Sequence, residues 1–141
     1  MNSLPDARKQ VLIVEDEQSI RDTLAELFDV PGNHVTTAEL LPAALECLRA
    51  HRFDLIVTDL RLGGKRDGGL QVMALAGMLS PDATVLVLTA YPDDSNRQAS
   101  ERLGALHFLE KPVDLSTIAQ LAGRTKVHTA FSSPTVSDTV M

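Results

Sequence analysis

The sequence predicts an α/β domain in which a parallel sheet carries helices on both of its faces. Short apolar runs alternate along the chain with segments whose apolar residues recur at helical spacing. This alternation repeats five times within 141 residues, a length that suits a single domain. Because crossovers between parallel strands are right-handed, successive helices are expected to cover both faces of the sheet.

The strands are predicted from short runs of aliphatic residues without alternating polar positions. Such continuous runs are typical of strands that are covered on both faces. A weaker run around Val35 is expected to form the second strand. The other four strands, in chain order, are expected at Val11–Val14, Leu55–Val57, Val85–Leu88 and Leu106–Leu109.

The helices are predicted from apolar stripes between these strands. The first, second, third and fifth stripes consist of Ile20, Leu24, Leu27 and Phe28; Leu41, Ala44, Leu45 and Leu48; Leu70, Met73, Ala74 and Gly77; and Leu115, Ile118, Ala119 and Ala122. The fourth stripe, near Ala99 and Leu103, is weakly amphipathic, so that helix is expected to be the least firmly docked. Turns are predicted at Gly32-Asn33, Gly63-Gly64, Pro81-Asp82 and Gly104.

One folded domain is expected over residues 8–125. The remainder, residues 126–141, is expected to be a flexible tail or a linker stub, because it is rich in Ser and Thr, contains Pro134 and lacks a periodic apolar face. No DNA-binding or enzymatic segment is recognised after residue 126, so the output pathway cannot be predicted.

The composition of the chain excludes several classes of function. A formal net charge of -6 and an aromatic content of 4% argue against direct binding to nucleic acid or to an anionic membrane. No apolar run approaches the roughly 20 residues of a membrane span. With one cysteine, Cys47, and no recognisable secretion signal, the expected location is the cytoplasm.

The residues with chemical function follow the predicted strands. Glu15-Asp16-Glu17 follows the first strand, Asp59 ends the third, Thr89 ends the fourth and Lys111 follows the fifth. Because ligands bind at the carboxyl ends of parallel strands, these groups are expected to share one cleft. Taken alone, the acids would be better explained as helix caps, and Lys111 could be a solvated surface charge; the combination favours a site.

Carboxylates about 4 Å apart repel by roughly 4 kcal/mol per pair at an effective dielectric constant near 20, so the cluster requires a compensating cation. Oxygen ligands favour Mg²⁺, with Mn²⁺ as a substitute, over Ca²⁺, for which no oxygen-rich loop is present. With this cation and Lys111 neutralising phosphoryl oxygens, Asp59 could act as a nucleophile on phosphorus. The Thr89 hydroxyl could then sense the phosphoryl group.

This ordered set of residues resembles the receiver domain of two-component response regulators, over about residues 8–125. The resemblance implies a flavodoxin-like fold with strand order 2-1-3-4-5. It implies that a histidine kinase or a histidine phosphotransfer protein phosphorylates Asp59. It also implies that Asp16, Asp59 and the backbone carbonyl of Arg61 bind Mg²⁺, with Glu15 binding directly or through water.

The resemblance assigns further roles. Lys111 would pair with the phosphoryl group and precede a cis peptide bond to Pro112, Thr89 would move toward the group, and Phe108 would change rotamer. The fourth helix, fifth strand and fifth helix would present the signalling face, to a downstream protein or to a second copy in a homodimer. Arg61 and Tyr91 would flank the path of the hydrolytic water, and their bulk predicts a long-lived phosphoryl state.

The expected function is therefore that of a phosphoacceptor signalling domain, which transfers the phosphoryl group to itself and loses it slowly, rather than that of an enzyme. The first alternative is a degenerate receiver that only docks proteins, without phosphorylation. A phosphohydrolase is disfavoured because Gln18 stands where its second acid would lie, two residues after Asp16. A flavin-binding domain is disfavoured because Glu15, Asp16 and Glu17 would repel the flavin phosphate.

Overall fold

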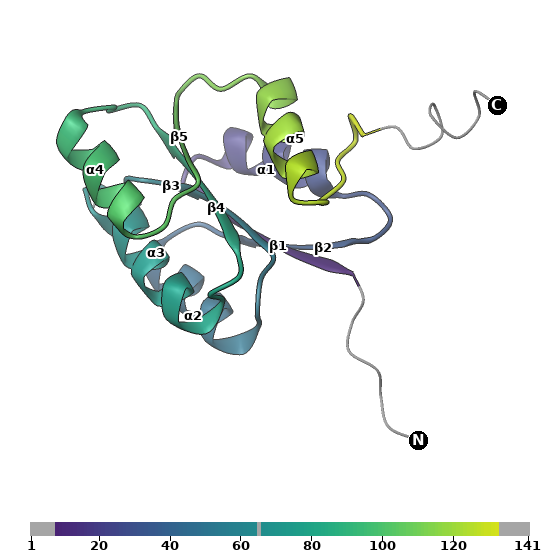
Figure 1. The fold of residues 1–141 in the computed structure, drawn as a ribbon, viewed down its shortest axis with the longest axis horizontal. Coiled ribbons are helices and arrows are strands. Elements are labelled where there is room, and N and C mark those ends of the chain that lie inside the picture. The colour runs from purple at the N-terminus through teal and green to yellow at the C-terminus, as the bar shows by residue number, and fades with distance from the viewer. Residues whose placement is uncertain (1–7, 65, 133–141) are drawn as a thin grey trace.

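Five parallel strands form one sheet in the order β2-β1-β3-β4-β5, as the resemblance implied. The computed structural model describes residues 8–64 and 66–132 (Figure 1). Helices alternate with the strands along the chain. The elements are β1 Lys9–Val14, α1 Gln18–Phe28, β2 Asn33–Ala38, α2 Leu41–Ala50, β3 Leu55–Asp59, α3 Gly68–Leu79, β4 Thr84–Thr89, α4 Asp94–Arg102, β5 His107–Glu110 and α5 Leu115–Arg124.

The sheet separates two helical layers, with α1 and α5 on one face and α2, α3 and α4 on the other (Figure 1). Alternate residues of β1 enter different cores. Val11 and Ile13 pack with α1 and α5, whereas Leu12 and Val14 pack with α2 and α3. All four side chains are fully buried, which explains why this strand has a continuous apolar run rather than an alternating one.

The two edge strands differ most from the sequence pattern. β2 pairs with β1 in register from Lys9–Asn33 to Val14–Ala38, and only Ala38 of its six residues is buried. Because an edge strand is exposed along one side, it needs few apolar residues. This explains why the apolar run around Val35 was weak. β5 begins and ends one residue later than predicted, at His107–Glu110, and Leu106 before it is 54% exposed.

The face of α3 was predicted partly wrongly. Met73 is buried as expected, but Ala74 and Gly77 face solvent, and Val72 and Ala76 occupy the core instead. This helix has apolar residues around its whole circumference, so their spacing did not identify a buried face. The first, second and fifth predicted stripes place their central residues in the core, whereas Leu103 of the fourth is exposed.

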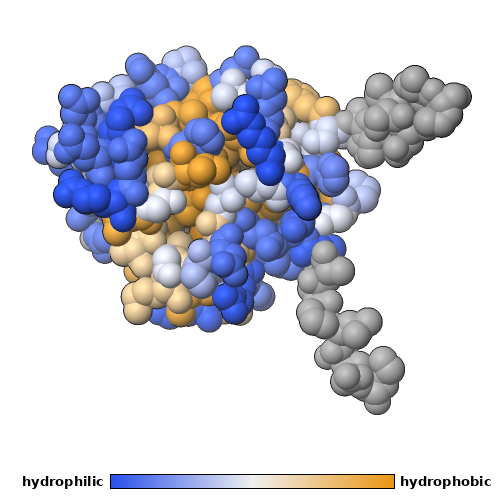
Figure 2. Space-filling view, in the orientation of Figure 1, coloured by the Kyte–Doolittle hydropathy of each residue, from blue (hydrophilic) through white to orange (hydrophobic). Residues whose placement is uncertain are grey.

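Helix α4 is polar, and Figure 2 shows hydrophilic residues over it. Ser100 is its one buried residue. Its hydroxyl is the one buried side-chain oxygen or nitrogen without a hydrogen-bond partner among the described residues. The helix begins at a capped position, where the Asp93 carboxylate accepts from the Asn96 backbone N–H at 2.7 Å.

Residues 126–132 continue the packed structure beyond the boundary predicted at residue 125. Val127 is buried, the Ala130 N–H donates to the Leu27 carbonyl at 2.8 Å, and the Asn33 side chain donates to the His128 carbonyl at 2.8 Å. The rest of the predicted tail, residues 133–141, lies outside the described residues. Within the described part of the chain, no helix is both long and apolar enough to cross a bilayer.

Candidate functional site

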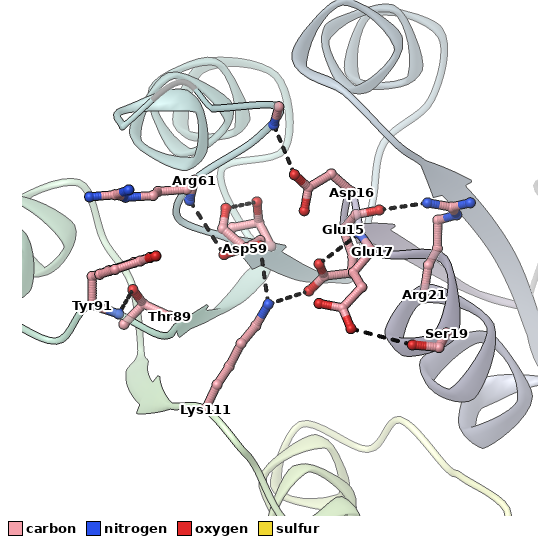
Figure 3. A network of polar contacts seen from close by, with 12 residues as sticks. Glu15, Asp16, Glu17, Ser19, Arg21, Asp59, Arg61, Thr89, Tyr91 and Lys111 are labelled. Carbon is pink, nitrogen blue, oxygen red and sulfur yellow. Dashed lines mark hydrogen bonds and ion pairs between the residues drawn. The ribbon is translucent and has the colours of Figure 1, made fainter.

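The carboxyl ends of β1, β3, β4 and β5 bring the predicted functional residues to one edge of the sheet. Glu15 and Asp16 follow β1, Asp59 ends β3, Thr89 ends β4 and Lys111 follows β5. Figure 3 shows the acids and Lys111 directed toward one another. Because β3 is the central strand, Asp59 lies between two sets of side chains. The acids after β1 lie on one side of it, and the residues at the ends of β4 and β5 lie on the other.

Three acids form the centre of this site. One carboxylate oxygen each from Glu15, Asp16 and Asp59 lies within 4.8 Å of the other two. Glu15 is 1% exposed and Asp59 7% exposed, so water screens their charges poorly. Oxygen ligands at this separation suit a hard divalent cation, and the donor set therefore fits Mg²⁺ or Mn²⁺.

Lys111 bridges two of these acids. Its Nζ lies 2.8 Å from Oε1 of Glu15 and 3.1 Å from Oδ2 of Asp59. Burial alone would lower the pKa of the Lys111 ammonium, but the hydrogen bond to Glu15 and the charge of Asp59 outweigh it and raise the pKa. The lysine thus stays protonated. The peptide bond between Lys111 and Pro112 is cis, as the resemblance implied.

The pKa of Glu15 is strongly perturbed. Burial raises its pKa to about 7, with a smaller contribution from the charge of Asp59, against the lowering effect of the hydrogen bond from Lys111. Its other oxygen, Oε2, accepts from the Glu17 N–H at 3.1 Å. The Arg21 guanidinium also donates to the Glu15 backbone carbonyl at 2.9 Å. Every polar group of this residue is therefore held in place.

Backbone amides of the β3–α3 loop bind two of the acids. Oδ2 of Asp16 accepts from the Gly63 N–H at 3.0 Å, and Oδ1 of Asp59 accepts from the Arg61 N–H at 3.3 Å. Gly63 has a φ of +57°, a left-handed backbone conformation that favours glycine. The loop thus connects the acids of β1 with the end of β3.

The residues predicted to sense phosphorylation, or to delay its loss, make contacts of their own. The Thr89 hydroxyl is buried and accepts from the Tyr91 N–H at 2.9 Å. Phe108 packs against the core formed by α2 and α3, and the Arg97 guanidinium lies 4.8 Å from its ring centroid. The Arg61 guanidinium lies 3.7 Å from the ring centroid of Tyr91. The sequence placed these residues near the site but indicated neither stacking pair.

Other contributors were missed because they act through the backbone. Arg21 lies at an ordinary helical position, Gly63 was predicted only as a turn residue, and Gly69 was not singled out. An added Cβ on Gly69 would lie 2.8 Å from the Cα of Leu60 and closer still to the Asp59 carbonyl. Two glycines directly before a helical stripe were the available signal for this close approach.

The acids, Lys111 and the loop enclose a pocket of about 330 Å³, lined by Asp16, Glu17, Asp59, Arg61, Gly64, Ala90, Tyr91 and Lys111. A larger cavity of about 540 Å³ opens next to it, between α1 and the start of α5. Ile20, Leu24 and Val113 give that second cavity a mostly apolar lining. Lys111 lines both spaces, so the polar site and the apolar cavity adjoin.

Comparison with known proteins shows which family has this fold. The family model described as response regulator receiver domain matches residues 11–122. A response regulator receiver protein of Anaeromyxobacter sp. is 34% identical over 113 residues, which cover 80% of this chain and 47% of that protein. The chain spans 24% of the response regulator FleR of Pseudomonas aeruginosa, at 29% identity. It spans 87% of sporulation initiation phosphotransferase F of Bacillus subtilis, at 30% identity.

Solved structures agree with this result. A response regulator protein from Burkholderia pseudomallei, crystallised with a phosphorylated aspartic acid, a calcium ion and citrate, superposes with a TM-score of 0.72 at 30% identity. The match covers 94% of this chain and 73% of that one. The non-phosphorylated HemR receiver domain from Leptospira biflexa superposes with a TM-score of 0.74 at 29% identity, covering 84% and 94% of the two chains.

Proposed function

This chain belongs to the response regulator receiver domain family of two-component systems, and on that basis we propose that Asp59 accepts a phosphoryl group from a histidine kinase or a histidine phosphotransfer protein. One observation carries the proposal: Lys111 forms ion pairs with both Glu15 and Asp59 inside a three-acid cluster. A lysine shared in this way keeps the nucleophile and the other acids together despite their mutual repulsion.

In the proposed transfer, a carboxylate oxygen of Asp59 attacks phosphorus as the bond from phosphorus to the donor histidine nitrogen breaks. The leaving electron pair returns to the imidazole. Lys111 gives up its contact with Oδ2 of Asp59 and compensates charge on a phosphoryl oxygen instead. Mg²⁺, or Mn²⁺ in its place, would be held by Glu15, Asp16, Asp59 and the backbone carbonyl of Arg61, and when bound it supplies further positive charge. The reaction is self-catalysed phosphotransfer of a signalling domain.

We propose that the phosphodonor protein docks over the apolar cavity between α1 and α5. This cavity adjoins Lys111, so a helix seated there would bring its histidine beside Asp59. Ile20 and Leu24 supply the apolar contacts on the α1 side.

The proposed output begins at Thr89. Movement of its hydroxyl toward the phosphoryl group would release the Tyr91 N–H that it now accepts from. Phe108, on the neighbouring strand, would then change rotamer, and the face formed by α4, β5 and α5 would bind a downstream protein or a second copy of this chain. The polar, weakly anchored α4 suits an element that shifts between two states.

Slow loss of the phosphoryl group completes the proposal. Arg61 and Tyr91 line the pocket beside Asp59, where their side chains would obstruct an attacking water. The alternative of a docking module without phosphorylation is not favoured, because such a module has no need of a buried acid cluster with a paired lysine.

Intact-mass measurement tests the proposal. The parent chain, incubated with Mg²⁺ and a small acyl phosphate, should gain the mass of one phosphoryl group. Asp59→Asn should gain none, whereas Asp82→Asn, in an exposed turn, should react like the parent. A parent chain that stays unmodified with this donor and with a phosphorylated histidine protein would support the docking-only alternative.

A further inference from the structure

Arg61 and Tyr91 form one stacked pair at the edge of the site. The Arg61 Cζ lies 3.7 Å from the Tyr91 ring centroid, a distance typical of a cation–π contact. The two residues come from different loops, one after β3 and the other after β4. In Figure 3 their side chains lie side by side, and the Tyr91 hydroxyl points toward the part of the site that contains Asp59.

The backbone N–H of each stacked residue donates a hydrogen bond to a residue that takes part in the proposed reaction. The Arg61 N–H donates to Oδ1 of Asp59 at 3.3 Å. The Tyr91 N–H donates to the Thr89 hydroxyl at 2.9 Å. The stack therefore joins the loop of the proposed phosphoacceptor to the loop of the proposed sensing hydroxyl, in addition to the pairing of β3 with β4.

Tyr91 is also held from the side of α4. Its carbonyl accepts from the Asp93 N–H at 3.1 Å and from the Asn96 side chain at 3.4 Å. Yet the Tyr91 side chain is 52% exposed, so protein packing alone does not fix the position of its ring. The guanidinium of Arg61 stacks on this ring beside the pocket that both residues line.

We propose that Arg61 and Tyr91 act as a single positioning unit, which shields the phosphoryl group of Asp59 from water only while the two side chains are stacked. This inference rests on the proposed function and goes beyond it. Two independent bulky residues would each obstruct water separately, whereas a stacked pair loses its shielding when either partner is removed. The lifetime of the phosphoryl state then depends on the contact between the two loops.

A double-mutant cycle on phosphoryl lifetime tests this unit. The variants are Arg61→Met, which keeps the length of the side chain but removes its charge, Tyr91→Leu, and the combination of both. Each single variant should lose the phosphoryl group about two- to fivefold faster. This range is the equilibrium ratio that corresponds to the free energy of a cation–π contact at an exposed site. The double variant should be no faster than the faster single variant, and Tyr91→Phe, which keeps the ring, should resemble the parent.

A second readout does not require phosphorylation. Tyr91 is the only tyrosine and the chain has no tryptophan, so tyrosine fluorescence reports on this ring alone. Acrylamide should quench it more strongly in Arg61→Met than in the parent, and Arg49→Met, on the exposed side of α2, should match the parent. Unchanged quenching in Arg61→Met, or single-variant effects that multiply in the double variant, would overturn this inference alone. A chain that never accepts a phosphoryl group would overturn it together with the proposed function.

Discussion

Replacing glycines of α3 by alanine should have opposite effects at two positions of the same helix. Gly69 lies in the first turn, where its N–H donates to the Leu60 carbonyl at 2.8 Å and the helix is pressed against the end of β3. A Cβ at this position would lie 2.8 Å from the Cα of Leu60. Around Gly77, toward the other end of the helix, a Cβ would meet nothing within 4 Å.

The magnitudes follow from these contacts. Carbon atoms prefer separations of about 3.5 to 4.0 Å, so Gly69→Ala has to displace backbone, and overpacking of this kind costs about 1 to 3 kcal/mol. The gain in helix propensity recovers at most about 1 kcal/mol. We expect a net loss of about 1 kcal/mol, and at most about 2 kcal/mol, in the free energy of unfolding for Gly69→Ala. For Gly77→Ala we expect a gain of about 0.5 to 1 kcal/mol, because only the propensity changes.

Urea denaturation followed by circular dichroism measures both free energies of unfolding. The phosphorylation assay adds a functional difference, since the backbone displaced by Gly69→Ala includes the Asp59 carbonyl. Uptake of a phosphoryl group should be slower in Gly69→Ala than in Gly77→Ala under conditions in which both variants are folded. Equal stabilisation by the two substitutions would refute the close approach of α3 to β3.

Two further perturbations test the electrostatics of the site and the docking of α4. Because the pKa of Glu15 is raised to about 7, the folded, metal-free protein holds a proton that the unfolded chain releases, and its free energy of unfolding should fall as the pH rises from about 4.5 to about 7. Glu15→Gln should flatten this dependence; an unchanged slope would place the titration elsewhere. Mg²⁺ affinity, measured by calorimetry, should rise over the upper part of this interval, since a protonated carboxyl group is a poor ligand. Ser100→Ala should raise the free energy of unfolding by roughly 1 kcal/mol, because it removes a buried hydroxyl without a partner; a decrease would mean that the hydroxyl is satisfied.

The sequence could predict where the site residues lie because each one follows a strand that is buried on both faces. Val11–Val14 and Leu55–Val57 are apolar without interruption, so the first polar residues after them mark the carboxyl ends of the strands. In a parallel sheet those ends share one edge. The positions of Glu15, Asp16 and Asp59 therefore followed from local pattern together with sheet geometry.

The same local pattern could not predict contacts between loops. The hydrogen bond from the Gly63 N–H to Asp16 and the stack of Arg61 on Tyr91 join segments about 30 to 50 residues apart. They depend on the course of the β3–α3 and β4–α4 loops, which apolar periodicity does not describe. The prediction of the buried face of α3 failed for a related reason. A helix that is apolar on all sides is oriented by the elements that pack against it, and its own spacing of apolar residues does not identify the buried face.

One lysine does not compensate all the negative charge of the site. Glu15, Asp16 and Asp59 carry three negative charges when ionised, and Lys111 is the cation that pairs with two of them. The cluster can respond by taking up a proton, and the raised pKa of Glu15, caused first by burial and then by the charge of Asp59, is that response. A divalent cation would remove the need for the proton and free Lys111 to follow the charge on Asp59 in the proposed phosphorylation of that residue. Proton, metal and phosphoryl group are thus expected to compete for, or share, the same few oxygen atoms, so phosphoryl transfer should depend on pH through Glu15 rather than through the donor alone.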